Sequence, residues 1–247
     1  MSLGKLYGVG LGPGAADLMT LRAVKCLQSV DCIILPRRDE KSSSVSWRIA
    51  EENVGEVEGQ ERLYLSFPMS RDPEIIKPAW KIAFKEIHDR LLAGKDVAFM
   101  TVGDPFIYSS FIYLYEHAKE FWPDIEVETI AGVSSISAIP IVAGVPVADG
   151  QERVAIIPAL YEKDDLRTIL RMFDTVIFMK VSSVMPQIVE ALEAENLLDC
   201  AVYVARGTMD KEKIVHDLRT IKDKKCIYFS MVVVAKKHRS GILKGKV

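Results

Sequence analysis

The sequence has almost no excess charge of one sign. Its 247 residues include 32 lysines and arginines against 34 aspartates and glutamates, which gives a formal net charge of −2. Binding to nucleic acid needs a dense positive surface, so this balance argues against a nucleic-acid partner. It still allows a local basic cluster for a small anionic ligand. Aromatic residues make up only 8% of the chain and no internal repeat occurs, which excludes most propeller and solenoid folds.

Cysteine is scarce, and no two cysteines form a CxxC pair. The four cysteines are Cys26, Cys32, Cys200 and Cys226. Their spacing fits neither a structural zinc site nor a redox pair. We therefore expect four free, buried thiols in a reducing cytoplasm, and no bound metal. The sequence also lacks an HExxH motif, a P-loop lysine and a nucleophile elbow, which excludes the enzyme classes that depend on them.

Only one segment is both long and free of charge. Residues 129–148 carry no charged side chain over a length that could span a bilayer. The segment contains Gly132, Pro140, Gly144 and Pro146 as well as several hydroxyl residues. This composition favours a loop, a buried helix and a second loop, so we expect no membrane partner. The chain opens on a strand-like run, so we also expect no signal peptide.

Apolar runs alternate with helical patterns in the first half of the chain. Strand-like runs cover residues 5–9, 31–35, 96–101 and 125–130, and a helical pattern covers 74–92. Asp17 is the expected N-cap of a first helix that carries Leu18, Leu21 and Val24 at helical spacing. Strands separated by helices of this length predict right-handed crossovers and a mostly parallel sheet.

A second series of strands and helices begins near Gly150. Strand-like runs cover 153–157, 175–179, 201–205 and 227–235, with helical patterns at 164–173 and 184–195. Residues 145–150, where proline and glycine surround a polar break, form the expected domain boundary. We predict an α/β protein of two domains, residues 1–148 with a mostly parallel sheet and 149–247 with a mixed sheet. The ligand cleft is expected between them.

A glycine-rich turn follows the first strand. Gly10-Leu11-Gly12-Pro13-Gly14-Ala15 fits the GxGxxA dinucleotide fingerprint and stands between a strand and a helix. Pro13, however, lacks the amide that a pyrophosphate would use. No acidic residue follows the second strand to bind a ribose, but Arg37 and Arg38 stand there and arginine could bind the 2′-phosphate of NADP. An NADP-dependent reductase therefore stays open as an alternative.

Two further turns follow strand ends. Gly103-Asp104-Pro105 comes after the run 96–101, and Gly132-Val133-Ser134-Ser135 comes after the run 125–130. Parallel strands end at one edge of a sheet, which is where open α/β sheets bind ligands. Asp104 fits equally well as the N-cap of a helix beginning near Phe106. Taken together, the three turns predict a single crevice.

Four motifs stand in a fixed order along the chain. They are Tyr7-Gly8-Val9-Gly10-Leu11-Gly12-Pro13-Gly14, Asp31-Cys32-Ile33-Ile34-Leu35-Pro36, Gly103-Asp104-Pro105-Phe106-Ile107-Tyr108-Ser109 and Gly132-Val133-Ser134-Ser135-Ile136-Ser137-Ala138. In this order they resemble the tetrapyrrole methylase family over about residues 4–236. Within that family, Phe67-Pro68-Met69-Ser70, Phe178-Met179-Lys180-Val181 and Tyr228-Phe229-Ser230-Met231-Val232 are similar to the enzymes that methylate C20 of precorrin-2 or its cobalt form.

The resemblance implies S-adenosylmethionine (SAM) as methyl donor and S-adenosylhomocysteine (SAH) as product. SAM would bind between the two domains of a homodimer. The first domain would form the tetrapyrrole side of the cleft, and the second would contribute to SAM binding. The positions that match the family's SAM contacts are Leu11, Asp104, Ile107, Ser135, Ile136, Met179, Ala205, Ser230 and Met231. Among them, Asp104 would meet the cationic methionine end of SAM.

The implied reaction is methyl transfer to C20 of precorrin-2 or cobalt-factor II in cobalamin biosynthesis. C20 is electron-rich, as an enamine carbon is, so the protein mainly aligns the reactants and excludes water. The sequence nominates no catalytic base. Because guanidinium binds carboxylate in a two-pronged manner, Arg37 and Arg206 are expected to bind the substrate's carboxylates. Methylation of another corrin carbon and a non-catalytic tetrapyrrole carrier stay open as alternatives.

Overall fold

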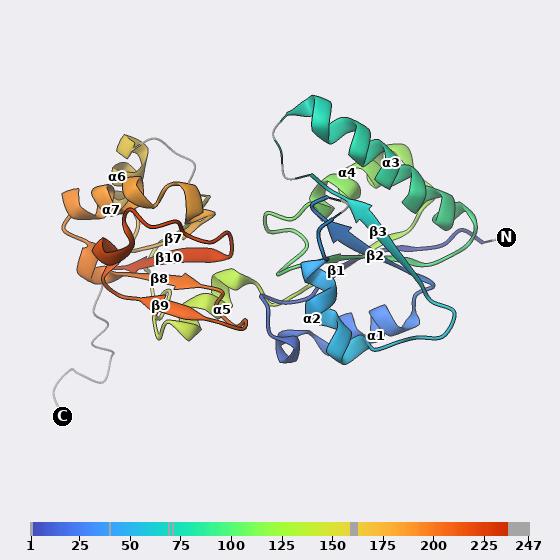
Figure 1. Cartoon of the computed structure of the whole chain (residues 1–247), viewed down its shortest axis with the longest axis horizontal. Helices are drawn as coiled ribbons and strands as arrows, with labels where there is room; N and C mark the ends of the chain where they lie inside the picture. Colours follow the sequence, from blue (N-terminus) through green and yellow to red (C-terminus); the bar gives the residue numbers. More distant parts are fainter. Residues whose placement is uncertain (1, 40, 69, 71, 159–162, 237–247) are drawn as a thin grey trace. The chain divides into compact units, whose positions relative to one another are not determined.

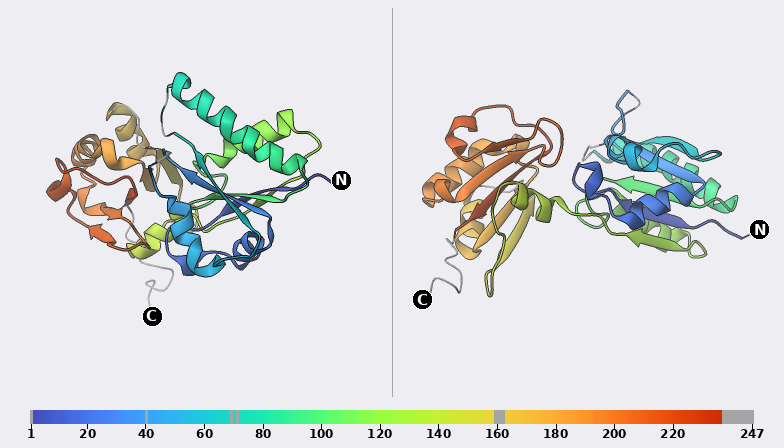
Figure 2. Two further views of the ribbon diagram at one scale, coloured as in Figure 1. Left: turned by 45° about the vertical axis from the view of Figure 1, so that its right-hand side comes forward. Right: turned by 90° about the horizontal axis from the view of Figure 1, so that it is seen from below.

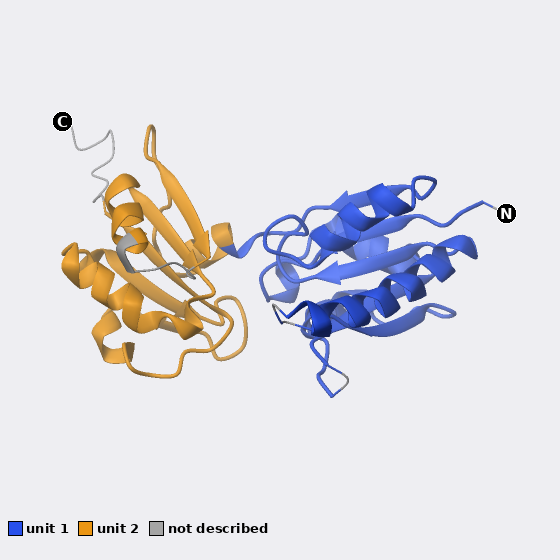
Figure 3. Ribbon diagram, turned by 90° about the horizontal axis from the view of Figure 1, so that it is seen from above, with its two compact units in different colours: residues 1–135 blue, residues 136–247 orange. Residues whose placement is uncertain are grey.

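The chain forms two compact units, Met1–Ser135 and Ile136–Val247 (Figure 3). The computed structural model describes residues 2–236 except 40, 69, 71 and 159–162. Sequence reasoning placed the boundary after residue 148. Helix α5 (Ser135–Val142) instead groups with the second unit, because its Ile139 packs into a core cluster with Val204 and Met231.

The first unit is built on a parallel sheet with the strand order β3-β2-β4-β1-β5. Its strands are β1 (Leu6–Gly10), β2 (Cys32–Arg37), β3 (Glu61–Ser66), β4 (Val97–Thr101) and β5 (Val127–Ile130). Its helices are α1 (Leu21–Ser29), α2 (Val45–Val54), α3 (Pro73–Leu92) and α4 (Phe111–Phe121). The predicted parallel sheet is thus confirmed, although β3 had not been predicted.

The helices of this unit lie on two opposite faces of the sheet (Figure 1). Apolar residues of α3 and α4 share one core cluster with the strands, in which Phe84 and Leu114 pack near Phe99. Helices α1 and α2 contact each other and cover the other face, where Ile33 and Leu35 are fully buried. Each strand alternates its side chains between the two faces, so both faces of this sheet are apolar.

Side-chain caps mark where helices α1 and α2 begin. Ser44 accepts a hydrogen bond from the amide of Trp47 at 3.3 Å and is the N-cap of α2. The prediction for the first helix was wrong in detail. Asp17 lies in a short 3₁₀ turn, Ala16–Leu18, and Thr20 is the N-cap of α1, accepting from the amide of Ala23 at 3.2 Å.

The second unit contains a mixed sheet with the strand order β6-β7-β10-β8-β9. Its strands are β6 (Val154–Pro158), β7 (Thr175–Met179), β8 (Ala201–Ala205), β9 (Lys213–Val215) and β10 (Ser230–Ala235). Strands β6 and β7 are parallel, and the other pairs are antiparallel, which confirms the predicted mixed sheet. Helices α6 (Lys163–Met172) and α7 (Met185–Ala194) lie together on one face of this sheet, and α5 packs on the other (Figures 1 and 2).

The uncharged segment 129–148 contains one short helix. Helix α5 buries Ala138 and Ile139 and is flanked by loops, which confirms the predicted loop, buried helix and loop. Over the described part of the chain, no helix has the length and apolar content needed to cross a membrane.

All four cysteines are free thiols, as predicted, but only Cys26 and Cys32 are buried. Burial raises the pKa of Cys26 to about 12 and that of Cys32 to about 11. Since the thiolate is the nucleophile, we expect iodoacetamide at about pH 8 to alkylate Cys200 and Cys226 first. Peptide mass spectrometry checks the order, with urea-unfolded protein as the control in which all four react alike. Equal native rates for Cys26 and Cys200 would contradict the burial.

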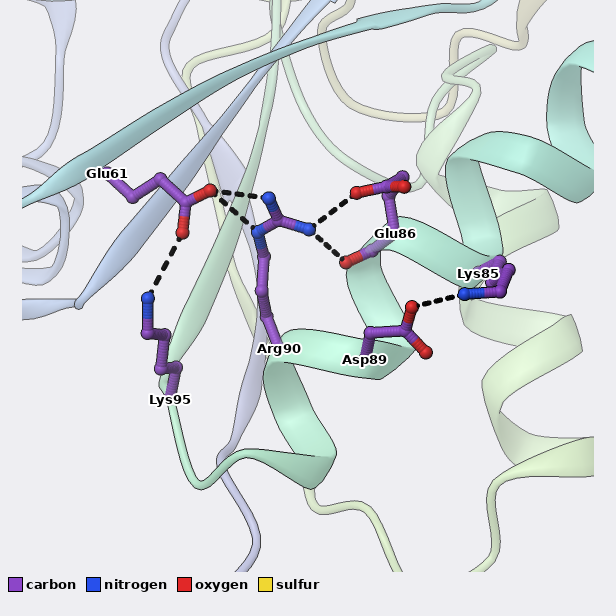
Figure 4. A network of polar contacts seen from close by, with 6 residues as sticks. All are labelled: Glu61, Lys85, Glu86, Asp89, Arg90 and Lys95. Atoms are coloured by element: carbon purple, nitrogen blue, oxygen red, sulfur yellow. Dashed lines mark hydrogen bonds and ion pairs between the residues drawn. The ribbon is translucent and has the colours of Figure 1, made fainter.

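An ion-pair network joins the start of β3 to the end of α3 (Figure 4). The Arg90 guanidinium donates to Glu61 Oε1 at 2.9 Å and to Glu86 Oε2 at 2.7 Å. Lys95 donates to the other oxygen of Glu61 at 3.2 Å. Glu61 begins β3, so the network lies at the amino ends of the parallel strands, away from the edge where their carboxyl ends meet.

The network makes stability depend on pH. Hydrogen bonds from Arg90 and Lys95 hold the pKa of Glu61 below its usual value. A carboxyl with a lowered folded-state pKa stabilises the protein above its unfolded pKa, and that contribution is lost as the pH falls through the folded value. Glu61→Gln is expected to reduce stability at pH 7 by on the order of 1 kcal/mol, with the difference from wild type shrinking below about pH 4.

Urea unfolding at several pH values measures this effect. The matched control is Asp89→Asn, which breaks the exposed pair of Lys85 and Asp89 on the same helix (Figure 4). That change is expected to cost less than Glu61→Gln does, because both side chains of the pair are exposed. A Glu61→Gln difference that is constant from neutral to acid pH would rule out the ionic contribution.

Candidate functional site

Three turns meet at the carboxyl edge of the parallel sheet. The turn after β1 and the turn after β4 are joined by paired backbone hydrogen bonds, Gly103 N to Gly12 O at 2.7 Å and Gly12 N to Gly103 O at 3.3 Å. The amide of Leu11 donates to Thr101 O at 3.0 Å. The turn after β5 joins them through Gly132, whose amide donates to Asp104 Oδ2 at 3.3 Å. The structure therefore brings the three predicted turns together.

Glycine is required at this junction because the backbones touch. A Cβ placed on Gly132 would lie 2.1 Å from Gly103 O and 2.8 Å from the Cα of Gly10. A Cβ on Gly10 would lie 2.5 Å from the Gly132 amide nitrogen. Gly12 and Gly103 have φ values of +83° and +77°, which only glycine adopts without strain.

The junction lies at the topological switch point of the sheet. From β1 the chain leads through α1 to β2 on one side, and from β4 it leads through α4 to β5 on the other. Strands β1 and β4 are neighbours, and the connections that leave them run in opposite directions along the sheet, with α1 on one face and α4 on the other (Figure 1). In open α/β sheets, ligands bind outside the carboxyl ends of the strands at such a point.

Asp104 holds two of the turns with one carboxylate. Its Oδ1 accepts from the amide of Phe106 at 2.9 Å, and its Oδ2 accepts from Gly132. The expected helix start near Phe106 was wrong, because α4 begins at Phe111 and Asp104 caps a loop turn instead. A carboxylate has lone pairs for more than two donors, so Asp104 can still accept from a ligand.

A buried hydroxyl pair closes the loop that carries Asp104. The hydroxyls of Thr101, at the end of β4, and Ser109 lie 2.8 Å apart, and Ser109 Oγ also accepts from the amide of Phe111. Sequence reasoning quoted Ser109 only as part of a motif and missed this contact. Its signal was a hydroxyl residue at each end of the loop. Between them, Ile107 is 36% exposed.

The remaining predicted residues of the first unit lie close to these turns. Leu11 is fully buried directly after β1, and Ser135 is the first residue of α5, after the turn that contains Gly132. Of the nine predicted SAM contacts, Leu11, Asp104, Ile107 and Ser135 belong to the first unit.

Four predicted residues lie together at one edge of the second sheet. In the register of β10, Met231 pairs with Met179 and Ser230 pairs with Ala205. These are the carboxyl ends of β7 and β8 beside the amino end of β10. Ile136 and Met179 pack against the core cluster that contains Met231.

The two predicted substrate arginines follow strand ends. Arg37 ends β2, is half-buried and has its guanidinium 5.7 Å from the centre of the Tyr64 ring. Arg206 follows β8, is exposed and has a φ of +52°, with its amide donating to Phe229 O at 2.8 Å. They belong to different units.

The geometry of the glycine turn does not suit a dinucleotide. The amides of Leu11 and Gly12 already donate to Thr101 and Gly103, and Pro13 has none. Helix α1 begins only at Leu21, after a 3₁₀ turn, whereas a pyrophosphate needs a helix N-terminus directly after the glycines. The reductase alternative is therefore not favoured. No group of three or more potential metal ligands occurs among the described residues.

A parallel sheet with a glycine junction at its switch point, joined to a mixed sheet, defines a two-unit α/β protein with turns placed where open α/β sheets bind ligands. A family model described as Tetrapyrrole (Corrin/Porphyrin) Methylases matches residues 5–222, and the chain belongs to this family.

Three similar curated proteins are named as C20-methyltransferases of precorrin-2 or cobalt-precorrin-2. The chain is 33% identical over 211 residues to a "Probable cobalt-precorrin-2 C(20)-methyltransferase" of Methanocaldococcus jannaschii, covering 85% of this chain and 86% of the relative. It is 30% identical to the Cobalt-precorrin-2 C(20)-methyltransferase of Salmonella typhimurium, and the match covers 94% of this chain and 97% of the relative. It is 31% identical to the Precorrin-2 C(20)-methyltransferase of a Sinorhizobium species, and the match covers 95% of this chain and 96% of the relative.

The fold is also found in solved structures. One is a uroporphyrin-III C-methyl transferase from Thermus thermophilus complexed with S-adenosylhomocysteine, which covers 94% of this chain with a TM-score of 0.65. It is 19% identical in sequence, and 92% of its own chain is covered. The predicted fold class and family are thus confirmed.

Proposed function

We propose that this chain is a SAM-dependent methyltransferase that methylates C20 of precorrin-2 or cobalt-factor II in cobalamin biosynthesis. The observation that carries the proposal is the similarity, at 30–33% identity over most of the chain, to proteins named for that reaction. The junction of three turns at the switch point supports it, because this is where the fold binds a small molecule.

The residues of the junction fit the methyl donor. Asp104 is half-buried, and the partners recorded for its carboxylate are two backbone amides, so its negative charge suits the cationic methionine end of SAM. The proposed contacts in the first unit are Leu11, Asp104, Ile107 and Ser135. Those in the second unit are Ile136, Met179, Ala205, Ser230 and Met231. When bound, SAM supplies a methyl group on a positively charged sulfur, which is an activated donor.

The chain's own contribution is to orient the reactants and exclude water. Direct displacement at the methyl group by C20 requires no covalent bond to the enzyme. The acetate and propionate groups of the tetrapyrrole require cationic partners, which we assign to Arg37 and Arg206. We also propose that the enzyme is a cytoplasmic homodimer, in keeping with its family resemblance.

Anaerobic assays with metal-free and cobalt-loaded precorrin-2, run side by side, test the proposal. We expect SAM-dependent addition of one methyl group to at least one of them, detected by mass spectrometry. NMR of the product with a labelled methyl group is expected to place it on C20. Transfer to another carbon would reassign the enzyme within the family, and no transfer to either substrate would refute the proposal.

Calorimetry separates this proposal from the reductase alternative. SAH is expected to bind at micromolar concentration, whereas NADPH is not, because in the turn after β1 the amides of Leu11 and Gly12 already donate to backbone carbonyls and Pro13 has none. Binding without transfer of labelled methyl groups would instead indicate a carrier.

A further inference from the structure

Two arginine–aromatic pairs lie on the same face of the first sheet. Strands β2 and β3 are parallel, with Leu35 opposite Tyr64 and Ile33 opposite Arg62. Because side chains two residues apart share a face, Arg37 lies on the same face as Leu35 and reaches Tyr64 diagonally. The Arg37 guanidinium carbon is 5.7 Å from the Tyr64 ring centre, and that of Arg62 is 4.2 Å from the Trp47 ring centre.

The two pairs differ in position. Arg62 stacks on Trp47 of α2 and donates to Gly55 O at 2.6 Å, so it ties strand β3 to the end of that helix. Arg37 is the last residue of β2, whose neighbour β4 leads directly into the turn with Gly103 and Asp104. Tyr64 is 46% exposed although its ring contacts the Arg37 guanidinium. The pair of Arg37 and Tyr64 therefore stands at the ligand edge, and the other pair does not.

We propose that Tyr64 is a positioning residue that orients the Arg37 guanidinium toward a carboxylate of the tetrapyrrole. This inference rests on the proposed function. A guanidinium that lies over an aromatic ring uses its flat face for that contact, while its N–H groups point outward in its own plane. Those N–H groups are the ones that bind a carboxylate with two parallel hydrogen bonds. The ring thus restricts the guanidinium without using its N–H donors, and an arginine has five of these, so a carboxylate can bind beside the partners that Arg37 already has.

The test compares Tyr64→Leu, which removes the ring, with Tyr64→Phe, which keeps it. Equilibrium titration with metal-free precorrin-2 under anaerobic conditions measures the Kd, and initial rates give KM and kcat. We expect Arg37→Ala to raise Kd and KM by roughly 10-fold or more, as for a lost charge-assisted hydrogen bond. Tyr64→Leu is expected to raise them about 2- to 5-fold, in the range of an exposed cation–π contact. Tyr64→Phe should remain close to wild type.

A double-mutant cycle decides whether Tyr64 acts through Arg37. In the Arg37→Ala background, Tyr64→Leu is expected to have no further effect on Kd, and SAH affinity should be unchanged throughout. Arg62→Ala is the matched control, expected to lower stability while leaving the tetrapyrrole Kd at the wild-type value. An equal effect of Tyr64→Leu with and without Arg37 would overturn the inference.

The outcomes for the inference and for the proposed function are separable. An unchanged Kd in Arg37→Ala, with methyl transfer intact, would overturn the role of both residues and leave the proposed reaction standing. If Tyr64→Phe binds the tetrapyrrole as weakly as Tyr64→Leu does, the hydroxyl matters rather than the ring, and this result would also overturn the inference. Wild-type binding that depends on Arg37, but without methyl transfer to either substrate form, would refute the proposed function alone.

Discussion

Gly132→Ala is expected to weaken SAH binding by roughly 100-fold or more while leaving the second unit folded. The added Cβ would lie 2.1 Å from Gly103 O and 2.7 Å from the carbonyl carbon of Gly10. Both neighbours are backbone atoms that are held by the sheet, so neither can turn aside as a flexible side chain would. The turns must move apart, which breaks the contact between the Gly132 amide and Asp104. Forced overpacking of this kind costs about 1–3 kcal/mol of stability.

Calorimetry with SAH and thermal unfolding measure the two consequences. A displacement that opens the junction is expected to weaken SAH binding by roughly 100-fold or more, about 2.7 kcal/mol. Ala131→Ser is the matched control, since residue 131 is exposed and lies next to Gly132 in the same turn. The control is expected to bind SAH as wild type does. Full SAH affinity in Gly132→Ala would mean that the junction does not shape the donor site.

The order of the elements could be predicted from the sequence where local signals were strong. Buried runs such as Val97–Thr101 and Thr175–Met179 are continuous and apolar, and this pattern predicts strands of a sheet that is buried on both faces. Strand β3 could not be found in this way. It is an edge strand in which most residues are partly exposed, and its glutamate and arginine resemble a solvated loop. Its identity depends on pairing with β2, which is a tertiary contact.

The site, too, has features that the sequence predicted and contacts that it could not predict. Glycines after strand ends were visible in the sequence, and the parallel topology that brings them together follows from the strand–helix alternation. The partners of Asp104 could not be predicted, because Gly132 lies twenty-eight residues further along the chain and meets it only through the sheet register. Likewise, the contact of Arg37 with Tyr64 requires β3, which sequence reasoning had missed.

Asp104→Asn is expected to weaken SAM binding by roughly 10- to 100-fold, the range for loss of a hydrogen bond to a charged group. The asparagine oxygen can still accept from the Phe106 amide, but its NH₂ group cannot accept from Gly132. The substitution therefore removes the negative charge and one of the two backbone contacts. Calorimetry with SAM measures the combined effect. Asp104→Ala also leaves the Phe106 amide without its acceptor, so this variant is expected to bind SAM more weakly than Asp104→Asn does.

Comparison of two ligands separates the two roles of the carboxylate. Methylthioadenosine contains the adenosine and sulfur of SAM but lacks the amino-acid end. If Asp104 meets that cationic end, Asp104→Asn should strongly weaken the binding of SAM and SAH but should hardly change the binding of methylthioadenosine. If Asp104 only holds the turns in place, all three ligands should weaken by a similar factor, because the deformed junction would be common to them. Equal losses would thus remove Asp104 from the direct contacts and keep it as the residue that joins the β4 and β5 turns.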